Sequence, residues 1–125
     1  DNYRKRTQRE RADLLKTAAS GLITQLLPVL DDFDRAARSF DSATDVVAIR
    51  EGVELIHGKL KKVLEQKGLE EIRSVGEPFD TDLHEAITNL PAESEEMRGK
   101  VVDEIEKGYM LNGAVIRYAK VAVAN

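Results

Sequence analysis

Apolar residues in the first forty positions recur at intervals of three and four, the spacing of one face of an α-helix. Two columns have a spacing of seven: Ala12, Ala19, Leu26, Phe33 and Phe40 form one, and Leu15, Leu22, Val29 and Ala36 form the other. They match the a and d positions of a heptad repeat. A third column of Ile23, Leu30 and Ala37 widens the apolar stripe. A wide stripe is typical of a four-helix bundle, so we expect a helix from about Arg9 to Phe40 that needs partner helices.

Two features modify this helix. Pro28 lies inside the repeat, where it removes one backbone hydrogen bond and crowds the carbonyl of Thr24. The periodicity continues on both sides, so we predict a kink at Pro28 rather than a helix end. Before Ala12 the repeat fades into DNYRKRTQRER, which predicts only weak helix.

A second helix is predicted after the polar segment from Ser39 to Asp45, which offers several N-cap side chains. Its apolar positions alternate steps of three and four: Val46, Ile49, Val53, Ile56, Leu60 and Val63. Gly68 follows Lys67 and is the expected C-terminal cap.

From Leu69 onward the pattern changes to short alternating runs. LEEIRSV, HEAITNL, KVVDEIEK and the final KGYMLNGAVIRYAKVAVAN favour strands, GEPFD favours a turn, and residues 91–99 favour an acidic loop. Asn112-Gly113 predicts a tight hairpin turn followed by one β-branched run through Val123. The fold class is therefore α+β, with helices over residues 1–68 and a small all-β domain of four to six strands over residues 69–125. We expect a fragment of residues 69–125 to fold poorly alone, because so short a β-unit is near the lower size limit.

Composition narrows the possible functions. The 125 residues are 42% apolar and 34% charged, contain no cysteine, and carry a net charge of −4. Residues 1–16 hold six basic and three acidic side chains, but acidic residues interrupt the basic run. We therefore expect no nucleic-acid partner. No apolar run approaches membrane-spanning length and no signal peptide is visible, so no membrane association is expected.

Candidate chemistry is sparse. His84 with Asp80 and Asp82 loosely resembles a set of metal ligands, but a histidine that caps a turn or bonds a backbone group is the favoured interpretation. The paired acids Glu70-Glu71 and Glu95-Glu96 are interpreted as solvated surface. The glycines do not form a phosphate loop between a strand and a helix. We expect neither a metal nor a cofactor, and no enzyme activity.

Several segments together resemble the GrpE family, the nucleotide exchange factors of DnaK-type chaperones. These segments are NYRKRTQRE, LLPVLDDFDRA, GVELI, GEPFDTDLHEAI and KGYMLNGAVIRYAKVAVA, in the order of the family. The resemblance implies a parallel homodimer in which paired helices lead into a four-helix bundle. It also implies that a β-domain binds the chaperone ATPase domain, opens its nucleotide cleft and accelerates ADP release.

The resemblance also assigns residues. The chaperone-binding residues it implies are Arg35, Pro78, Phe79, Met110, Leu111, Asn112, Gly113 and Val123. With the heptad pattern, the expected dimer interface contains Leu15, Leu22, Leu26, Val29, Phe33, Gly52, Val53, Ile56, Leu60 and Val63. Two positions depart from the family pattern: Ala114 follows LNG where arginine is common, and Tyr118 replaces the proline of RPAKV.

A second hypothesis remains open, a structural coiled-coil adaptor whose β-module docks another protein without nucleotide exchange. The family resemblance favours the bacterial cytoplasm over an organelle matrix. An effect on ADP release would separate the two functions, because an adaptor can bind a chaperone without changing that rate.

Overall fold

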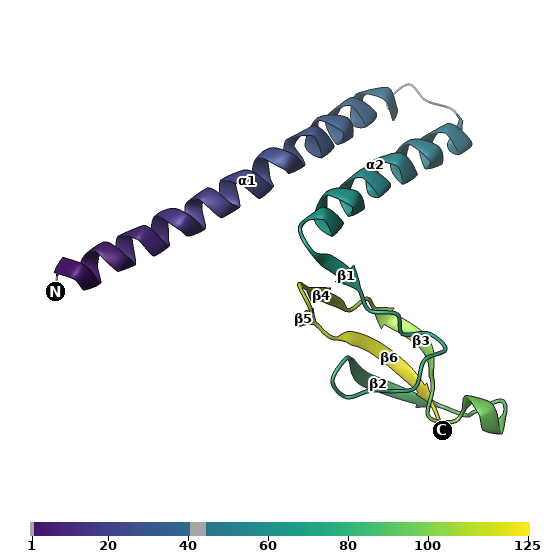
Figure 1. The fold of residues 1–125 in the computed structure, drawn as a ribbon. Coiled ribbons are helices and arrows are strands. Elements are labelled where there is room, and N and C mark those ends of the chain that lie inside the picture. Colours follow the sequence, from purple (N-terminus) through teal and green to yellow (C-terminus); the bar gives the residue numbers. More distant parts are fainter. Residues whose placement is uncertain (1, 41–44) are drawn as a thin grey trace. The chain divides into compact units, whose positions relative to one another are not determined.

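The computed structural model describes residues 2–40 and 45–125, and it divides the chain into two compact units. The first unit ends at Val63, and the second runs from Leu64 to Asn125. Among the described residues, two helices are followed by six strands (Figure 1). The predicted α+β class is confirmed.

Helix α1 spans Asn2–Phe40 and is longer than predicted. The expectation of only weak helix before Ala12 was wrong, because arginine, lysine, glutamine and glutamate are good helix formers without any apolar stripe. Arg6 also lies 3.7 Å from Glu10, one helical turn away, in an exposed ion pair. The helix continues through Pro28, as predicted, and the kink at that residue stays a prediction.

Helix α2 spans Val46–Gln66 and has an N-cap at Asp45. The backbone N–H of Val47 donates to Asp45 Oδ1 over 2.9 Å, which satisfies one free donor of the first turn. Gly68 follows the helix with φ of +100°, a left-handed conformation that glycine adopts at low cost. Of the predicted loop, Ser39 belongs to α1, and residues 41–44 lie outside the described residues.

One three-stranded antiparallel sheet has the order β1-β4-β5. It contains β1 (Leu69–Glu71), β4 (Tyr109–Leu111) and β5 (Ala114–Arg117). Asn112 and Gly113 connect β4 to β5 with φ of +50° and +86°. Two positive φ angles give a turn whose twist matches that of the strands, so the predicted hairpin is confirmed.

The second sheet has the order β2-β6-β3. It contains β2 (His84–Leu90), β6 (Ala119–Ala124) and β3 (Val101–Glu106), and a short 3₁₀ helix, η1 (Glu95–Met97), lies in the predicted acidic loop. The closing β-branched run is therefore not one strand, because it breaks at Tyr118 and enters two different sheets. β6 pairs in parallel with β2 and antiparallel with β3, so it is the central strand. Such long-range parallel pairing leaves no local turn signal in the sequence.

The core of the second unit lies around β6. Val101, Ala119, Val121 and Val123 form a buried cluster, and Phe79 packs against it. Gly108 lies so close to β6 that a β-carbon there would be 2.4 Å from the backbone nitrogen of Ala119. The chain can therefore pass from β3 to β4 beside β6 only because residue 108 has no side chain.

Candidate interaction site

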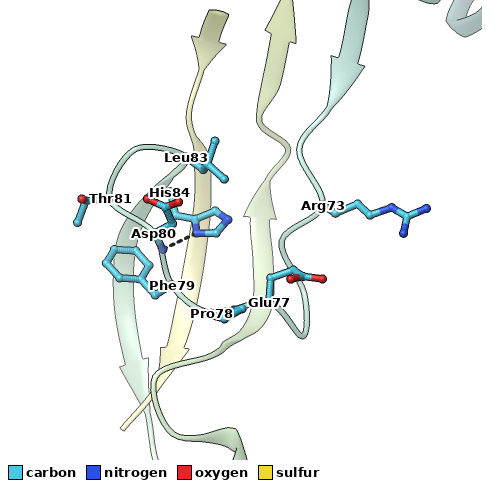
Figure 2. Close-up of a pocket in the computed structure, with 8 residues that line it drawn as sticks. All are labelled: Arg73, Glu77, Pro78, Phe79, Asp80, Thr81, Leu83 and His84. Atoms are coloured by element: carbon cyan, nitrogen blue, oxygen red, sulfur yellow. Dashed lines mark hydrogen bonds between the residues drawn. The ribbon is translucent and has the colours of Figure 1, made fainter. Parts of the chain in front are cut away.

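The turn that leads into β2 presents Pro78 and Phe79. The N–H of Phe79 donates to the carbonyl of Gly99 over 2.9 Å, and Pro78 forms an isolated bridge with Lys100. Pro78 is exposed, whereas Phe79 is half-buried. The turn lines an open hollow of about 650 Å³ (Figure 2). The two predicted contact residues are thus fixed at the protein surface by backbone hydrogen bonds.

His84 lies behind this turn and is buried. Its Nδ1 accepts the backbone N–H of Asp80 over 3.0 Å, and its ring stacks on Phe79 with centroids 5.8 Å apart (Figure 2). The prediction that His84 bonds a backbone group is confirmed. Its Nε2 has no hydrogen-bond partner among the described residues. The structure shows no group of three potential metal-ligand side chains in residues 2–40 and 45–125.

The hairpin tip contains the other predicted contact residues of the β-unit. Met110 is half-buried, while Leu111, Asn112, Gly113 and Ala114 are exposed. Asn112 also anchors the tip: its N–H donates to the carbonyl of Gly68 over 3.0 Å. Its side-chain oxygen would lie 2.0 Å from a β-carbon on Gly68. Gly68 thus accepts the backbone hydrogen bond that fixes the tip, and its lack of a side chain leaves room for the side chain of Asn112.

Charged side chains join the two sheets near the base of the hairpin. Lys107 bonds Glu71 of β1 and lies 3.9 Å from Glu104 of β3. The hydrogen bond that Lys107 donates to the Glu71 carboxylate raises the pKa of Lys107 above its usual value. The Glu71 carboxylate thus holds a cation at the surface of the β-unit. The sequence pattern gives no sign of this ion pair, because Glu71 and Lys107 are far apart in the sequence.

Arg117 extends this charged cluster to β5. Its guanidinium lies 5.3 Å from the ring centroid of Tyr109 and 3.6 Å from Glu106. Its Nε donates to the carbonyl of Lys107 over 3.0 Å. These contacts hold the β4–β5 hairpin against the segment that leaves β3.

Two predicted chaperone-binding residues belong neither to the turn nor to the tip. Val123 is only 6% exposed and packs in the core beside Phe79, so its side chain supports the sheet from inside. Arg35 is exposed on α1, in the helical unit, and lies 3.2 Å from Asp32. Lys59 of α2 donates a hydrogen bond of 2.9 Å to Asp32 Oδ2. This hydrogen bond is the main reason why the pKa of Asp32 is lowered.

Among the described residues, most of the exposed large apolar side chains lie in the helical unit. Among the predicted interface residues, Leu15, Phe33 and Val53 are exposed, Leu22, Leu26, Gly52, Leu60 and Val63 are half-buried, and Val29 and Ile56 are buried within the chain itself. Among the described residues of this unit, the predicted interface omitted four exposed leucines: Leu14 at 70%, Leu27 at 47%, Leu30 at 56% and Leu55 at 75%. Leu27 lies four residues after Ile23 and three before Leu30, and this helical spacing could have revealed Leu27 as part of the apolar stripe.

Comparison with known proteins identifies the family. The family model for GrpE matches residues 1–125. The chain belongs to the GrpE family. Protein GrpE of Parabacteroides distasonis is 51% identical over 98% of this chain, and that of Bacteroides thetaiotaomicron is 50% identical over the same share. Protein GrpE of Carboxydothermus hydrogenoformans is 44% identical over 99% of the chain.

This GrpE-family chain spans 62–64% of the length of those three relatives. Residues 107–124, the last of the five segments that resemble the family, contain the hairpin and the central strand β6. In residues 2–40 and 45–125, neither helix is long and apolar enough to cross a membrane.

Proposed function

We propose that this chain is the dimerising and chaperone-binding part of a nucleotide exchange factor, a co-chaperone that accelerates ADP release from a DnaK-type chaperone. The observation that carries the proposal is the match of the whole chain to the GrpE family. The relatives come from bacteria, which supports a role in the bacterial cytoplasm. The chain would act by binding alone, without a cofactor or a catalytic residue.

The helical unit supplies the dimer in this proposal. A single chain leaves Leu15, Phe33 and Val53 exposed along the predicted interface. Leu14, in the same unit, is exposed as well. Burying apolar surface between two copies releases roughly 25 cal/mol per Å². A homodimer therefore explains why this unit keeps so many large apolar side chains in contact with water.

The β-unit supplies the chaperone contact. Pro78 lies on a turn held by backbone bonds, and Asn112 anchors a tip that presents Leu111 and Gly113. Both surfaces belong to the second compact unit. Pre-organised contacts bind with a smaller entropy cost than mobile loops, which suits a protein that must hold another in an open state.

The exchange activity follows from thermodynamic linkage. A factor that binds the open, nucleotide-free chaperone more tightly than the ADP form must weaken ADP binding by the same factor. Leu111 and Met110 would contribute apolar contact at the tip. Ala114 offers no charge at a position where the family pattern has arginine, so we expect the tip to rely on apolar rather than ionic contacts.

Stopped-flow release of a fluorescent ADP analogue from a DnaK-type chaperone tests the proposal. We expect the chain to accelerate release roughly fivefold or more, the lower end of typical coupling between two sites. Binding without acceleration, both in the natural chain and after Ala114→Arg, would instead support an adaptor. If only Ala114→Arg accelerates release, the chain has the exchange fold but a weakened tip.

A further inference from the structure

A set of hydrogen bonds around Asp80 fixes the turn that carries Phe79. The N–H groups of Leu83 and His84 donate to the carbonyl of Asp80 over 3.0 and 2.8 Å. The N–H of Asp82 donates to Asp80 Oδ1 over 2.9 Å. In return, the N–H of Asp80 donates to His84 Nδ1 over 3.0 Å. His84 is the only side chain among these contacts that lies in the following strand, so it ties the turn to β2.

This arrangement specifies the protonation state of His84. An imidazole nitrogen accepts a hydrogen bond only when it carries no proton, so Nδ1 is bare and the ring is neutral with its proton on Nε2. A charged imidazolium would carry N–H groups on both nitrogens. One of them would then face the N–H of Asp80, and two donors cannot bond. Protonation of His84 is thus incompatible with the turn as folded.

The surroundings of His84 offer little to hold a charged ring in place. In the turn, Asp80 Oδ1 already accepts the N–H of Asp82. Before the turn, Arg73 and Glu77 line the same hollow (Figure 2). Across the sheet, His84 pairs with the uncharged Ala119 of β6.

The next residues of the two paired strands complete the charged neighbours. On β6, Lys120 is paired with Glu85, which follows His84 on β2. Nε2 itself is buried and has no partner among the described residues. The neutral ring is therefore held by one backbone hydrogen bond and by its stacking on Phe79.

We propose that His84 is a positioning residue whose neutral imidazole holds Pro78 and Phe79 in their chaperone-binding arrangement, so that acidification weakens chaperone binding through this turn. The stacked ring fixes one face of Phe79, and the Asp80 bond fixes the backbone beside it. This inference rests on the proposed function. It adds to that function a dependence of chaperone binding on pH, and it assigns a role to His84, which does not contact the chaperone itself.

Two variants separate the acceptor from the charge. Asparagine at position 84 places a carbonyl oxygen near the site of Nδ1 and does not titrate, so His84→Asn keeps the acceptor at every pH. Leucine fills space without an acceptor. The matched control is His57→Asn, which changes the exposed histidine of α2.

The first experiment measures the Kd for a DnaK-type chaperone from about pH 7.5 to about pH 5.5, the range in which histidine ordinarily changes charge. For the natural chain we expect Kd to rise roughly fivefold on acidification, because this factor corresponds to the loss of one typical hydrogen bond. His57→Asn should behave the same. His84→Asn should lose this extra rise, although it binds somewhat more weakly at every pH because it lacks the ring that stacks on Phe79. His84→Leu, which lacks both the ring and the acceptor, should bind more weakly still. An unchanged pH profile in His84→Asn would overturn the proposal.

A second experiment needs no chaperone and so separates this inference from the proposed function. In NMR spectra of the chain alone, the natural protein should show the Nε2–H tautomer of His84 at neutral pH. The amide signal of Asp80 should shift on acidification in the natural protein and in His57→Asn, but not in His84→Asn. The amides of Val121 and Val123 report whether the variant is folded. An Nδ1–H tautomer in the natural protein would refute the inference even if every variant failed to fold.

Discussion

The two units of this chain bury their apolar residues in different ways. In the β-unit, Val101, Ala119 and Val121 are fully buried by the chain itself. In the helical unit, Leu15 remains 66% exposed and Ile23 57% exposed. The β-unit contains its own core, whereas the helical unit has a core that a single chain only begins to form.

This difference indicates how each unit gains stability. A sheet closes its core through backbone pairing between distant strands, which one chain provides. A long amphipathic helix offers one apolar stripe and depends on whatever packs against it. Substitutions in the helical unit should therefore act mainly on association, and substitutions in the β-unit mainly on the folding of one chain.

The largest effect is expected in the helical stripe. Leu26→Asp or Phe33→Asp would bury a charge between two copies and should weaken association by at least ~3 kcal/mol. Thr24→Asp, an exposed change on the same helix, is the control and should leave the dimer intact. Analytical ultracentrifugation measures the result. A dimer that survives both Leu26→Asp and Phe33→Asp would contradict the bundle.

The next effect is expected at the close approach of Gly108 to β6. A β-carbon in Gly108→Ala would lie 2.4 Å from the backbone nitrogen of Ala119, and backbone cannot move aside cheaply. We expect a loss of ~1–3 kcal/mol in the unfolding free energy of the β-unit, from denaturant titration. Gly58→Ala meets nothing within 4 Å on α2 and should stabilise the helix by up to ~1 kcal/mol. Equal effects of the two changes would show that residue 108 is not tightly packed.

A smaller effect is expected where Gly68 meets Asn112. Gly68→Ala combines a strained positive φ with a contact to Asn112 Oδ1, which a side-chain rotation can relieve. We expect a cost of ~1–2 kcal/mol, measured by thermal unfolding, together with shifted NMR signals at the hairpin tip.

Two fragments test the backbone hydrogen bond between Asn112 and Gly68. Residues 69–125 lack the Gly68 carbonyl that accepts the Asn112 N–H, whereas residues 64–125 keep it. The longer fragment should have the higher melting temperature by circular dichroism. Identical melting curves would mean that this contact contributes nothing to the β-unit.

The smallest effect concerns Asp32 and Lys59. Because the bond from Lys59 lowers the pKa of Asp32 below its ordinary value of 3.8, this pair stabilises the helical unit above that pH. The contribution is lost as the pH falls through the lowered pKa. Asp32→Asn should flatten the acid limb of thermal stability, while Asp31→Asn, its exposed neighbour, should change it less. Parallel acid limbs for Asp32→Asn and the natural chain would exclude a role for the pair.

Local patterns predicted the parts of this fold that depend on neighbouring residues. The heptad columns led to α1, the alternating steps of three and four led to α2, and Asn112-Gly113 led to the β4–β5 hairpin. Helices and tight turns are built from contacts a few residues apart. The family segments pointed to the turn at Pro78 and Phe79. The polar start of α1 was missed because helix propensity acts there without an apolar stripe.

The sequence alone thus determined two helices and a hairpin, and it predicted the surfaces on which a partner would act. Only the tertiary structure decided that the closing run divides at Tyr118, that β6 pairs in parallel with β2, and that His84 accepts the Asp80 N–H. It also placed Val123 inside the core and Glu71 on Lys107. These features join residues far apart in the chain, and the free energy of such a contact depends on which segments meet in space rather than on the residues beside it.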